Sequence, residues 1–408
     1  MDFAELLDVL NNKQREAVSA PLGNYLVLAG AGSGKTRVLT HRIAWLIGVE
    51  GVSEGSIMAV TFTNKAAAEM RHRIESVLSD GNQRLFGMWV GTFHSIAHRL
   101  LRAHHLDADL PQDFQILDSE DQLRLLKRLM KLHHFDEKSF PPKQAAWYIN
   151  NKKDEGLRPN QIDDHQDRQE REWIRIYQIY QDACDRAGLV DFAEILLRSY
   201  ELFLHKPLIL QRYQQRFQHI LVDEFQDTNL AQLRILFNLT DTPHGDAPNI
   251  MAVGDDDQAI YSFQGADVGN IHRFRKRYPD HASVVLTDNY RSSQTILDRA
   301  REIITQASGR LETSMDIDKQ LQAHTNDTNS QVTLSALPSH QEEFAWIAES
   351  IQENITKGIK PSEIAVIARR HSDLIALLPY LNHGGIVVNY ERRDNVLDDE
   401  RVQLLELM

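Results

Sequence analysis

A glycine-rich segment near the N-terminus has the residue types that bind phosphate groups. It reads Ala29-Gly30-Ala31-Gly32-Ser33-Gly34-Lys35-Thr36 and fits the template G-x-x-x-x-G-K-[ST], with a small alanine in the first position. Glycines let backbone N–H groups curl around phosphate oxygens, and the N-terminus of a following helix adds positive potential. We expect Lys35 to reach the β- and γ-phosphates of a nucleotide and Thr36 to bind Mg²⁺ through its hydroxyl. The alternative is a glycine-rich turn without a ligand. It is disfavoured because a strand-like run precedes the segment and a helical pattern follows it.

An acidic pair follows another apolar run, much later in the chain. Residues 219–222 read HILV and lead directly into Asp223-Glu224. Phosphoryl transfer depends mainly on positioning and charge neutralisation. We therefore expect Asp223 to hold Mg²⁺ through water molecules and Glu224 to orient or deprotonate the attacking water. Acidic pairs at strand ends are also common surface features, so this prediction depends on the phosphate loop that accompanies it.

The elements that must position these residues alternate between strand-like and helical patterns. Such alternation predicts a parallel sheet covered by helices. Residues 111–212 are mostly helical in pattern and are predicted to interrupt the sheet domain as an insertion. Residues 281–408 begin another unit, with a loop-rich stretch at 307–330. The expected strands are 24–30, 56–62, 88–94, 219–225, 249–255, 331–339 and 363–370.

Composition sets limits on the class of protein. A chain of 408 residues has room for two or three domains. Its net charge of −13 argues against a generally basic nucleic-acid binder but leaves room for a local groove of opposite sign. With Cys184 as the single cysteine, the chain cannot build an internal disulfide or a cysteine zinc cluster. No apolar run approaches the ~20 residues of a membrane span, and no signal-type core is present. We therefore expect a cytoplasmic protein with no membrane partner.

Several further segments occur in a fixed order along the chain. Together they resemble the UvrD/PcrA/Rep family of superfamily I DNA helicases, over nearly all of residues 1–300 and weakly afterwards. Beyond the phosphate loop, the segments are 10–17 (LNNKQREA), 59–70 (AVTFTNKAAAEM), 91–95 (GTFHS), 223–228 (DEFQDT), 253–266 (VGDDDQAIYSFQGA) and 289–293 (NYRSS).

The resemblance implies an α/β fold of three parts. A RecA-like P-loop NTPase domain with a parallel sheet would comprise residues 1–110 and 213–280. An all-α insertion that contacts DNA would comprise 111–212. The beginning of a second RecA-like domain would comprise 281–408.

The resemblance also implies ATP and Mg²⁺ as ligands and assigns roles in the nucleotide site. Gln14 would read the adenine edge, with Arg37 near the base and sugar. Tyr290 would stack on the adenine. Arg291 would approach the γ-phosphate as an arginine finger, and Gln258 would sense that phosphate. The implied catalytic set is Lys35, Asp223, Glu224, Gln258 and Arg291.

Aromatic residues would form a track for single-stranded DNA, since base–aromatic stacking tolerates any sequence. The resemblance nominates Phe62, His94, Phe192, Tyr261 and Phe263 for stacking. It nominates Thr61, Asn64 and Thr92 for phosphate contacts. The alternative for each is packing in the protein core.

Two departures from the family pattern affect the expected activity. Phe263-Gln264 stands where family members have Trp-Arg, which predicts weaker DNA binding or weaker coupling between the sites. We find no counterpart before Met408 of the family's later motifs, which include a second arginine finger. The sequence is therefore interpreted as a truncated or fragmentary helicase.

The favoured hypothesis is an ATP-dependent 3′-to-5′ helicase or translocase. It would act on single-stranded DNA and on single-strand/duplex junctions. The family implies a role in repair or replication, with proteins of those pathways as partners. One alternative is a helicase–nuclease subunit of the RecB/AddA type. The other is a truncated module that binds ATP and DNA without turnover.

Overall fold

The computed structural model describes residues 3–78, 87–242, 248–260, 266–267, 269–308, 310–325 and 330–389. The chain divides into two compact units, residues 1–330 and 331–408. Within the described residues, no helix has the length and apolar character needed to cross a membrane.

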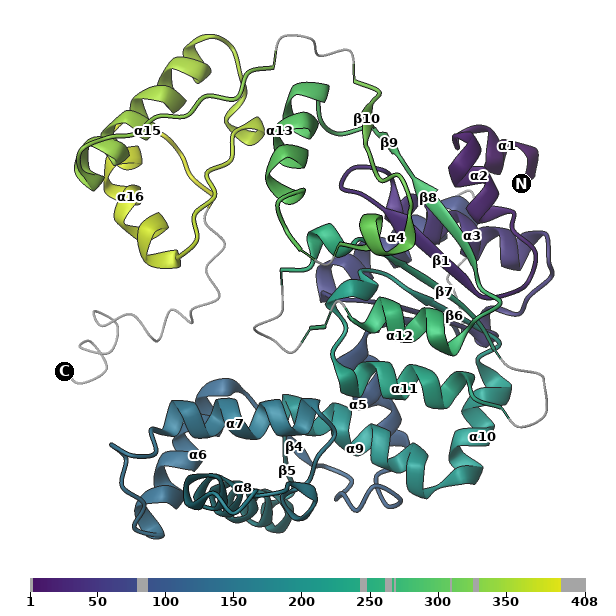
Figure 1. Cartoon of the computed structure of the whole chain (residues 1–408), viewed down its shortest axis with the longest axis vertical. Coiled ribbons are helices and arrows are strands. Elements are labelled where there is room, and N and C mark those ends of the chain that lie inside the picture. The colour runs from purple at the N-terminus through teal and green to yellow at the C-terminus, as the bar shows by residue number, and fades with distance from the viewer. Residues whose placement is uncertain are drawn as a thin grey trace. The chain divides into compact units, whose positions relative to one another are not determined.

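The first unit is built on a six-stranded sheet whose paired strands are all parallel (Figure 1). Their order in the sheet is β3-β2-β6-β7-β1-β8. The strands confirm the expected α/β fold class. They are β1 (Tyr25–Ala29), β2 (Ile57–Thr61), β3 (Trp89–Thr92), β6 (His219–Val222), β7 (Asn249–Gly254) and β8 (Ala282–Leu286).

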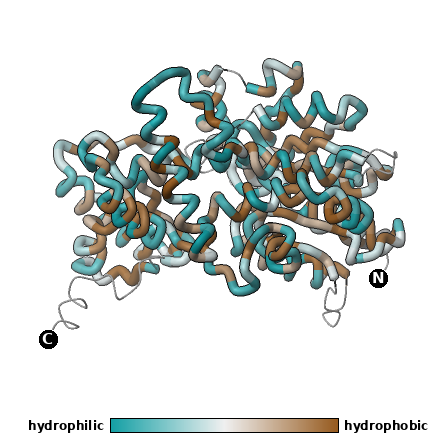
Figure 2. Tube along the Cα trace, turned by 90° about the horizontal axis from the view of Figure 1, so that it is seen from below, coloured by the Kyte–Doolittle hydropathy of each residue, from teal (hydrophilic) through white to brown (hydrophobic). Residues whose placement is uncertain are grey.

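Helices cover both faces of this sheet because its strands are apolar on both sides. Leu26 and Leu28 belong to one core cluster, whereas Tyr25, Val27 and Ala29 belong to the other, as the two-residue period of a strand requires. Figure 2 shows hydrophobic positions gathered along the interior of the fold. One face packs against α2 (Asn12–Val18), α3 (Lys35–Gly48) and α4 (Asn64–Leu78). The other packs against α5 (Phe93–Ala103), α9 (Phe192–His205), α10 (Pro207–Arg216), α11 (Leu230–Thr240) and α12 (Gly269–Arg277).

A helical block with its own core interrupts the sheet domain. Its helices are α6 (Ser119–Leu132), α7 (Pro142–Asp154) and α8 (Arg168–Ala187), which pack through residues such as Met130, Ile149 and Tyr177. It also contains a parallel pair of short strands, β4 (Gln115–Leu117) and β5 (Leu189–Asp191), so it is not entirely α-helical as expected. Helix α9 and the first part of α10 fall within the range predicted for the insertion, 111–212. Yet Leu196 and Phe203 of α9 pack into the core of the sheet.

The first unit extends past the boundary expected at residue 281. Strand β8 pairs with β1, and Val284 and Leu286 are buried against the sheet. The chain then continues through four short elements before residue 330. These are β9 (Asp288–Asn289), α13 (Gln294–Ile304), α14 (Leu311–Met315) and β10 (Gln322–Ala323), of which β10 pairs with β9.

In the second unit, α15 (His340–Thr356) packs against α16 (His371–His383) through Ile351, Leu377 and Leu381. The strands expected at 331–339 and 363–370 are not present in the structure. A strand needs a neighbour for its backbone hydrogen bonds, and the described residues of this unit supply none. Leu334 and Ile367 are accordingly more than nine-tenths exposed.

The remaining described elements are short. They are α1 (Phe3–Asp8), η1 (Glu54–Ser56), η2 (Pro159–Gln161), η3 (Phe225–Asp227), η4 (Asp256–Gln258) and η6 (Pro361–Glu363).

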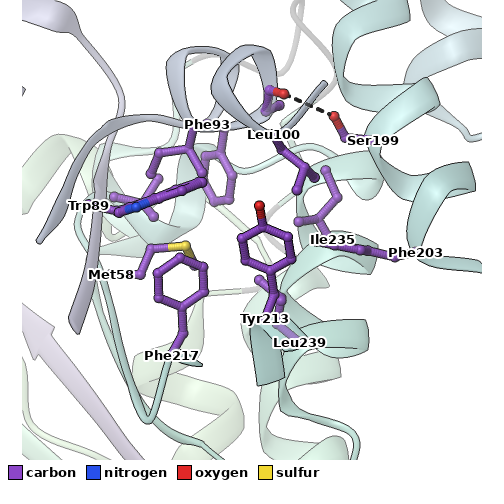
Figure 3. Close-up of a pocket in the computed structure, with 13 residues that line it drawn as sticks. Met58, Trp89, Phe93, Leu100, Ser199, Phe203, Tyr213, Phe217, Ile235 and Leu239 are labelled. Atoms are coloured by element: carbon purple, nitrogen blue, oxygen red, sulfur yellow. Dashed lines mark hydrogen bonds between the residues drawn. The ribbon is translucent and has the colours of Figure 1, made fainter. Parts of the chain in front are cut away.

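A small cavity lies between the sheet and the helices on one face (Figure 3). Met58, Trp89, Phe93, Tyr213 and Phe217 are among the side chains that line it. Its volume is about 20 Å³, roughly the space that one water molecule needs. Because nearly all of the lining is apolar, we interpret it as a packing gap rather than a ligand site.

Candidate nucleotide and DNA sites

The phosphate loop lies between the end of β1 and the start of α3. Gly32 and Gly34 have φ angles of 72° and 89°, a left-handed conformation that favours glycine. A Cβ atom on Gly34 would lie 2.7 Å from Nε2 of Gln14, and one on Gly32 would lie 2.7 Å from Cβ of Arg291. Backbone conformation therefore favours glycine at both positions. An added Cβ at Gly34 would in addition displace the amide of Gln14, and one at Gly32 would clash with Cβ of Arg291. Ser33 stabilises the turn by donating its hydroxyl to the carbonyl oxygen of Gly30 (2.7 Å).

The acidic pair follows β6, as expected, and faces the loop lysine. Nζ of Lys35 lies 2.6 Å from Oε2 of Glu224. Glu224 itself has a left-handed backbone (φ 48°). Asp223 is only 6% exposed. Burial first, and then the charge of Glu224, raise its pKa to about 7, although Lys35 partly offsets this. Two carboxyl groups thus share one nearby ammonium group, an arrangement that favours binding of a further cation.

A closed ring of hydrogen bonds joins the loop to the ends of two strands. Besides Glu224, Lys35 donates to Oε1 of Gln258 (3.1 Å). Nε2 of Gln258 donates to Oδ2 of Asp255 (2.6 Å), and the backbone N–H of Asp255 donates to Oε1 of Gln226 (3.0 Å). Nε2 of Gln226 donates to Glu224 (2.9 Å) and closes the ring. The structure therefore brings the predicted residues Lys35, Glu224 and Gln258 together.

Gln14 lies directly beside the loop. It is almost fully buried, and its Nε2 donates to the carbonyl oxygen of Ser33 (2.9 Å) while its Oε1 accepts from the N–H of Asn11 (3.2 Å). A carboxamide has two hydrogens and two lone pairs, so one donor and one acceptor remain for a base. Arg37 is exposed at the start of α3 and makes a long contact of 3.4 Å to the carbonyl oxygen of Val9.

Tyr290 and Arg291 also lie against the loop. The N–H of Tyr290 donates to the carbonyl oxygen of Gly32 (3.0 Å), and its half-exposed ring receives a hydrogen bond from Asn11 at the hydroxyl (2.8 Å). Arg291 is exposed, with its backbone N–H held by Oδ1 of Asn289 (2.9 Å). Both residues therefore border the space beside the phosphate loop.

Sequence reasoning missed three residues that shape this site. Asn289 donates to the carbonyl oxygen of Ala31 and so fastens the segment at 289–293 to the loop. It stands inside a motif that we recognised, although we gave it no role. Asn11 caps α2, a role that its type and place signal. Leu321 packs against Gly30, where an added Cβ would lie 2.7 Å from it, and nothing in the local sequence predicts this contact.

Two of the aromatic residues nominated for DNA stacking are neighbours. The rings of His94 and Phe192 lie 5.9 Å apart and meet edge to face, although 98 positions separate them in the sequence. Phe192 is 51% exposed, so core packing does not account for it. Burial lowers the pKa of His94 to about 4, so its ring is uncharged at neutral pH and suited to stacking.

A buried ion cluster fixes the residue that precedes Phe192. Asp191 caps α9 by accepting a hydrogen bond from the N–H of Glu194 (2.7 Å). Nζ of Lys153 lies 2.7 Å from Asp191 and 3.0 Å from Glu194, and all three side chains are nearly inaccessible to solvent. Phe192 therefore projects from a rigid helix start.

The other nominated DNA residues have different surroundings. Phe62 is half-buried and Asn64 is exposed at the start of α4. Thr61 is buried, and its hydroxyl has no hydrogen-bond partner in the structure. Thr92 is the N-cap of α5, and its hydroxyl accepts from the N–H of Ser95 (3.2 Å). The predictions for Tyr261, Phe263 and Gln264 lie outside the described residues.

The UvrD/REP helicase N-terminal domain model matches residues 10–279, about two thirds of the chain. The chain belongs to the UvrD/REP helicase family. The family's UvrD-like helicase C-terminal domain model matches residues 284–401. This second match corrects our expectation that the resemblance weakens after residue 300.

Similar proteins of this UvrD/REP family cover nearly the whole chain. DNA helicase II of Haemophilus influenzae is 60% identical over 395 residues, which are 95% of this chain and 53% of that protein. DNA helicase II of Escherichia coli is 53% identical, with the same coverage of both chains. The ATP-dependent DNA helicase PcrA of Leuconostoc citreum is 38% identical over 98% of this chain and 52% of its own length. The chain thus spans about half the length of the curated relatives it matches.

Proposed function

We propose that this chain is an ATP-driven motor that moves 3′-to-5′ on single-stranded DNA and separates duplexes at single-strand/duplex junctions. The observation that carries the proposal is the ring joining Lys35, Glu224, Gln226, Asp255 and Gln258. In this ring the ammonium of Lys35 donates both to Glu224, the proposed base, and to Gln258, the proposed γ-phosphate sensor. The likeness to proteins named DNA helicase II and ATP-dependent DNA helicase PcrA supports DNA as the substrate and ATP as the energy source. The 3′-to-5′ direction is what the family resemblance implies.

The geometry suggests how nucleotide binding prepares the site for hydrolysis. In the structure, the ammonium of Lys35 is paired with the carboxylate of Glu224. A γ-phosphate at the loop would attract Lys35 and leave the Glu224 carboxylate free to orient the attacking water. Thr36 and Asp223 would hold Mg²⁺, which when bound supplies charge neutralisation for the phosphates. The crowded, buried carboxyl of Asp223 fits such a cation.

Gln14, Tyr290 and Arg291 would bind the rest of the nucleotide. The free donor and acceptor of Gln14 match the paired acceptor and donor on the adenine edge. The half-exposed ring of Tyr290 offers a stacking surface, and Arg291 would stabilise charge on the transferred phosphate. Arg37 would lie near the base and sugar.

The half-exposed ring of Phe192 and the partly buried ring of His94 beside it would contact DNA bases. Each stacked base contributes about 1–3 kcal/mol and requires no particular sequence, which suits a motor that moves along a strand. Phe62 and Asn64 would extend this track. Cytoplasmic work in repair or replication, with partners from those pathways, is the accompanying proposal.

The alternative of a module that binds ATP and DNA without turnover is not favoured. Similarity to DNA helicases extends over 95% of the chain, and models of both helicase domains match it.

The test of polarity uses two labelled duplexes that differ only in having a 3′ or a 5′ single-stranded tail. We expect strand displacement of the 3′-tailed duplex only, with dependence on ATP and Mg²⁺. Displacement of both duplexes, or displacement with ADP, would contradict the proposal. Asp223→Asn serves as the inactive control.

A further inference from the structure

A segment outside every recognised motif, residues 310–324, runs along the nucleotide site. Leu321 packs on Gly30 of the phosphate loop. Strand β10 pairs with β9, next to Tyr290, and Nε2 of His324 lies 2.9 Å from Oδ1 of Asp288. The same segment therefore touches the phosphate loop and the strand that leads into Tyr290 and Arg291.

Lys319 of this segment is almost fully enclosed by carboxylates. Its Nζ donates to Oδ1 of Asp255 (2.6 Å), Oδ1 of Asp256 (2.5 Å) and Oδ2 of Asp257 (2.9 Å). The side chain is 5% exposed. Arg310 supports the cluster with two hydrogen bonds to Asp257 (2.8 and 2.7 Å). The three carboxyl groups are thus matched by two cations that both come from residues 310–319.

Lys319 reaches the reacting centre through Asp255. One carboxylate oxygen of Asp255 binds Lys319 and the other accepts from Nε2 of Gln258 (2.6 Å). Because a carboxamide has a donor end and an acceptor end, this contact leaves Oε1 of Gln258 turned toward Lys35 (3.1 Å). An acceptor at that place suits a water molecule that attacks the γ-phosphate.

We propose that Lys319 is a positioning residue for ATP hydrolysis, holding Asp255 as a charged acceptor so that Gln258 keeps its oxygen toward Lys35. This inference rests on the proposed function. Without Lys319, the buried carboxylates of Asp255 and Asp256 would lose the ammonium that both contact and would repel each other. Asp255 would then no longer be held against Nε2 of Gln258, so the carboxamide would lose its fixed orientation.

Loss of Lys319 should affect only the steps that involve the γ-phosphate. Gln14 and the glycine loop, which would contact the base and the inner phosphates, make no contact with Lys319. Loss of Lys319 should therefore lower kcat while the affinity for ADP stays unchanged. A merely structural role would instead lower kcat, ADP affinity and melting temperature together.

The experiment compares the parent chain with Lys319→Met and Lys319→Arg. The control is Lys357→Met, which removes an exposed lysine paired with Glu353. We expect Lys319→Met to lower the kcat of DNA-stimulated ATP hydrolysis by about 10- to 100-fold, as for other residues that orient a reacting group. The dissociation constant for ADP should not change. Lys319→Arg should restore part of kcat, because a guanidinium can also bind several carboxylates.

A double variant tests the route through Asp255. If Lys319 acts by holding that carboxylate, Asp255→Asn combined with Lys319→Met should be no slower than Asp255→Asn alone. Additive losses would overturn the proposal. So would an unchanged kcat in Lys319→Met, or a parallel loss of ADP affinity without recovery in Lys319→Arg.

A second measurement separates this inference from the proposed function. If the parent binds nucleotide but shows no turnover, the proposed motor is wrong. Lys319 is then judged by the ratio of the dissociation constants for ADP and ATPγS. A smaller ratio in Lys319→Met supports its role at the γ-phosphate, and an unchanged ratio overturns it. If the parent binds neither nucleotide, both proposals fall.

Discussion

Asp154 lies at the end of α7, where the helical block meets the sheet domain, and its ionisation opposes folding. Its carboxyl accepts a hydrogen bond from Nδ2 of Asn229, the N-cap of α11 (2.7 Å). Burial first, and then the charges of Asp191 and Glu155, raise its pKa to about 7, while Lys153 acts in the opposite direction. Asp154→Asn keeps the shape and the acceptor for Asn229 but removes the charge.

Proton linkage gives the sign and size of the change that Asp154 makes to the free energy of unfolding. The ordinary pKa of 3.8 applies to the unfolded chain, and the folded value is about 7. Unfolding therefore releases a proton between these values, and the free energy of unfolding falls as the pH rises through that window. Each pKa unit corresponds to about 1.4 kcal/mol. Ionisation of Asp154 thus lowers the free energy of unfolding by less than about 1 kcal/mol at pH 4 and by about 4 kcal/mol at pH 8.

Urea denaturation of parent and variant between pH 4 and pH 8 measures this directly. We expect nearly equal stability at pH 4 and a variant that becomes progressively more stable than the parent as the pH rises. Asp182→Asn, which alters an exposed carboxyl on α8, should follow the parent curve. Parallel curves for the parent and Asp154→Asn would refute the reasoning.

Three further substitutions test the sites. Phe192→Ala should weaken binding of a single-stranded oligonucleotide by roughly 5- to 150-fold, the equivalent of one stacked base; equal anisotropy titrations for parent and variant would contradict the stacking role. Gly34→Ala should abolish nucleotide binding by calorimetry. By contrast, Gly358→Ala should bind nucleotide normally, because Gly358 has a similar φ of 94° but no atom lies within 4 Å of an added Cβ. Equal nucleotide binding by the two variants would contradict the claim that an added Cβ at Gly34 disturbs the phosphate loop. Lys153→Met should cost about 3–5 kcal/mol of stability by leaving buried carboxylates without their partner. Lys152→Met, at a neighbour paired near the surface with Glu155, should cost about 0–1 kcal/mol. Equal melting temperatures for Lys153→Met and Lys152→Met would contradict a stabilising role for the buried ion cluster.

The strands of the sheet could be predicted because burial on both faces leaves a continuous apolar run. The runs at 24–30 and 249–255 became β1 and β7, with small changes at their ends. The segment 331–339 alternates apolar and polar residues, and 363–370 contains an apolar run. Neither forms a strand, because pairing depends on a neighbour that the pattern does not specify. The two family models divide the chain between residues 279 and 284, close to the boundary expected at 281. The sequence did not indicate that β8, just after this boundary, pairs with β1.

Local spacing predicted the phosphate loop, whereas contacts between distant segments could not be predicted. Lys35 and Thr36 follow from a template eight residues long. Lys319 meets Asp255 across 64 positions, and no local pattern connects them. Thr92 shows a different limit. A threonine before a helix suits a phosphate contact and an N-cap equally well, and the structure uses it as a cap.

Steady-state ATP hydrolysis by this chain, with and without single-stranded DNA and beside Lys35→Ala, tests the central claim most directly. We predict turnover that rises with DNA and that Lys35→Ala abolishes, since Lys35 joins the loop to both Glu224 and Gln258. Nucleotide binding without turnover, or turnover that survives Lys35→Ala, would contradict the claim that this site drives a DNA motor.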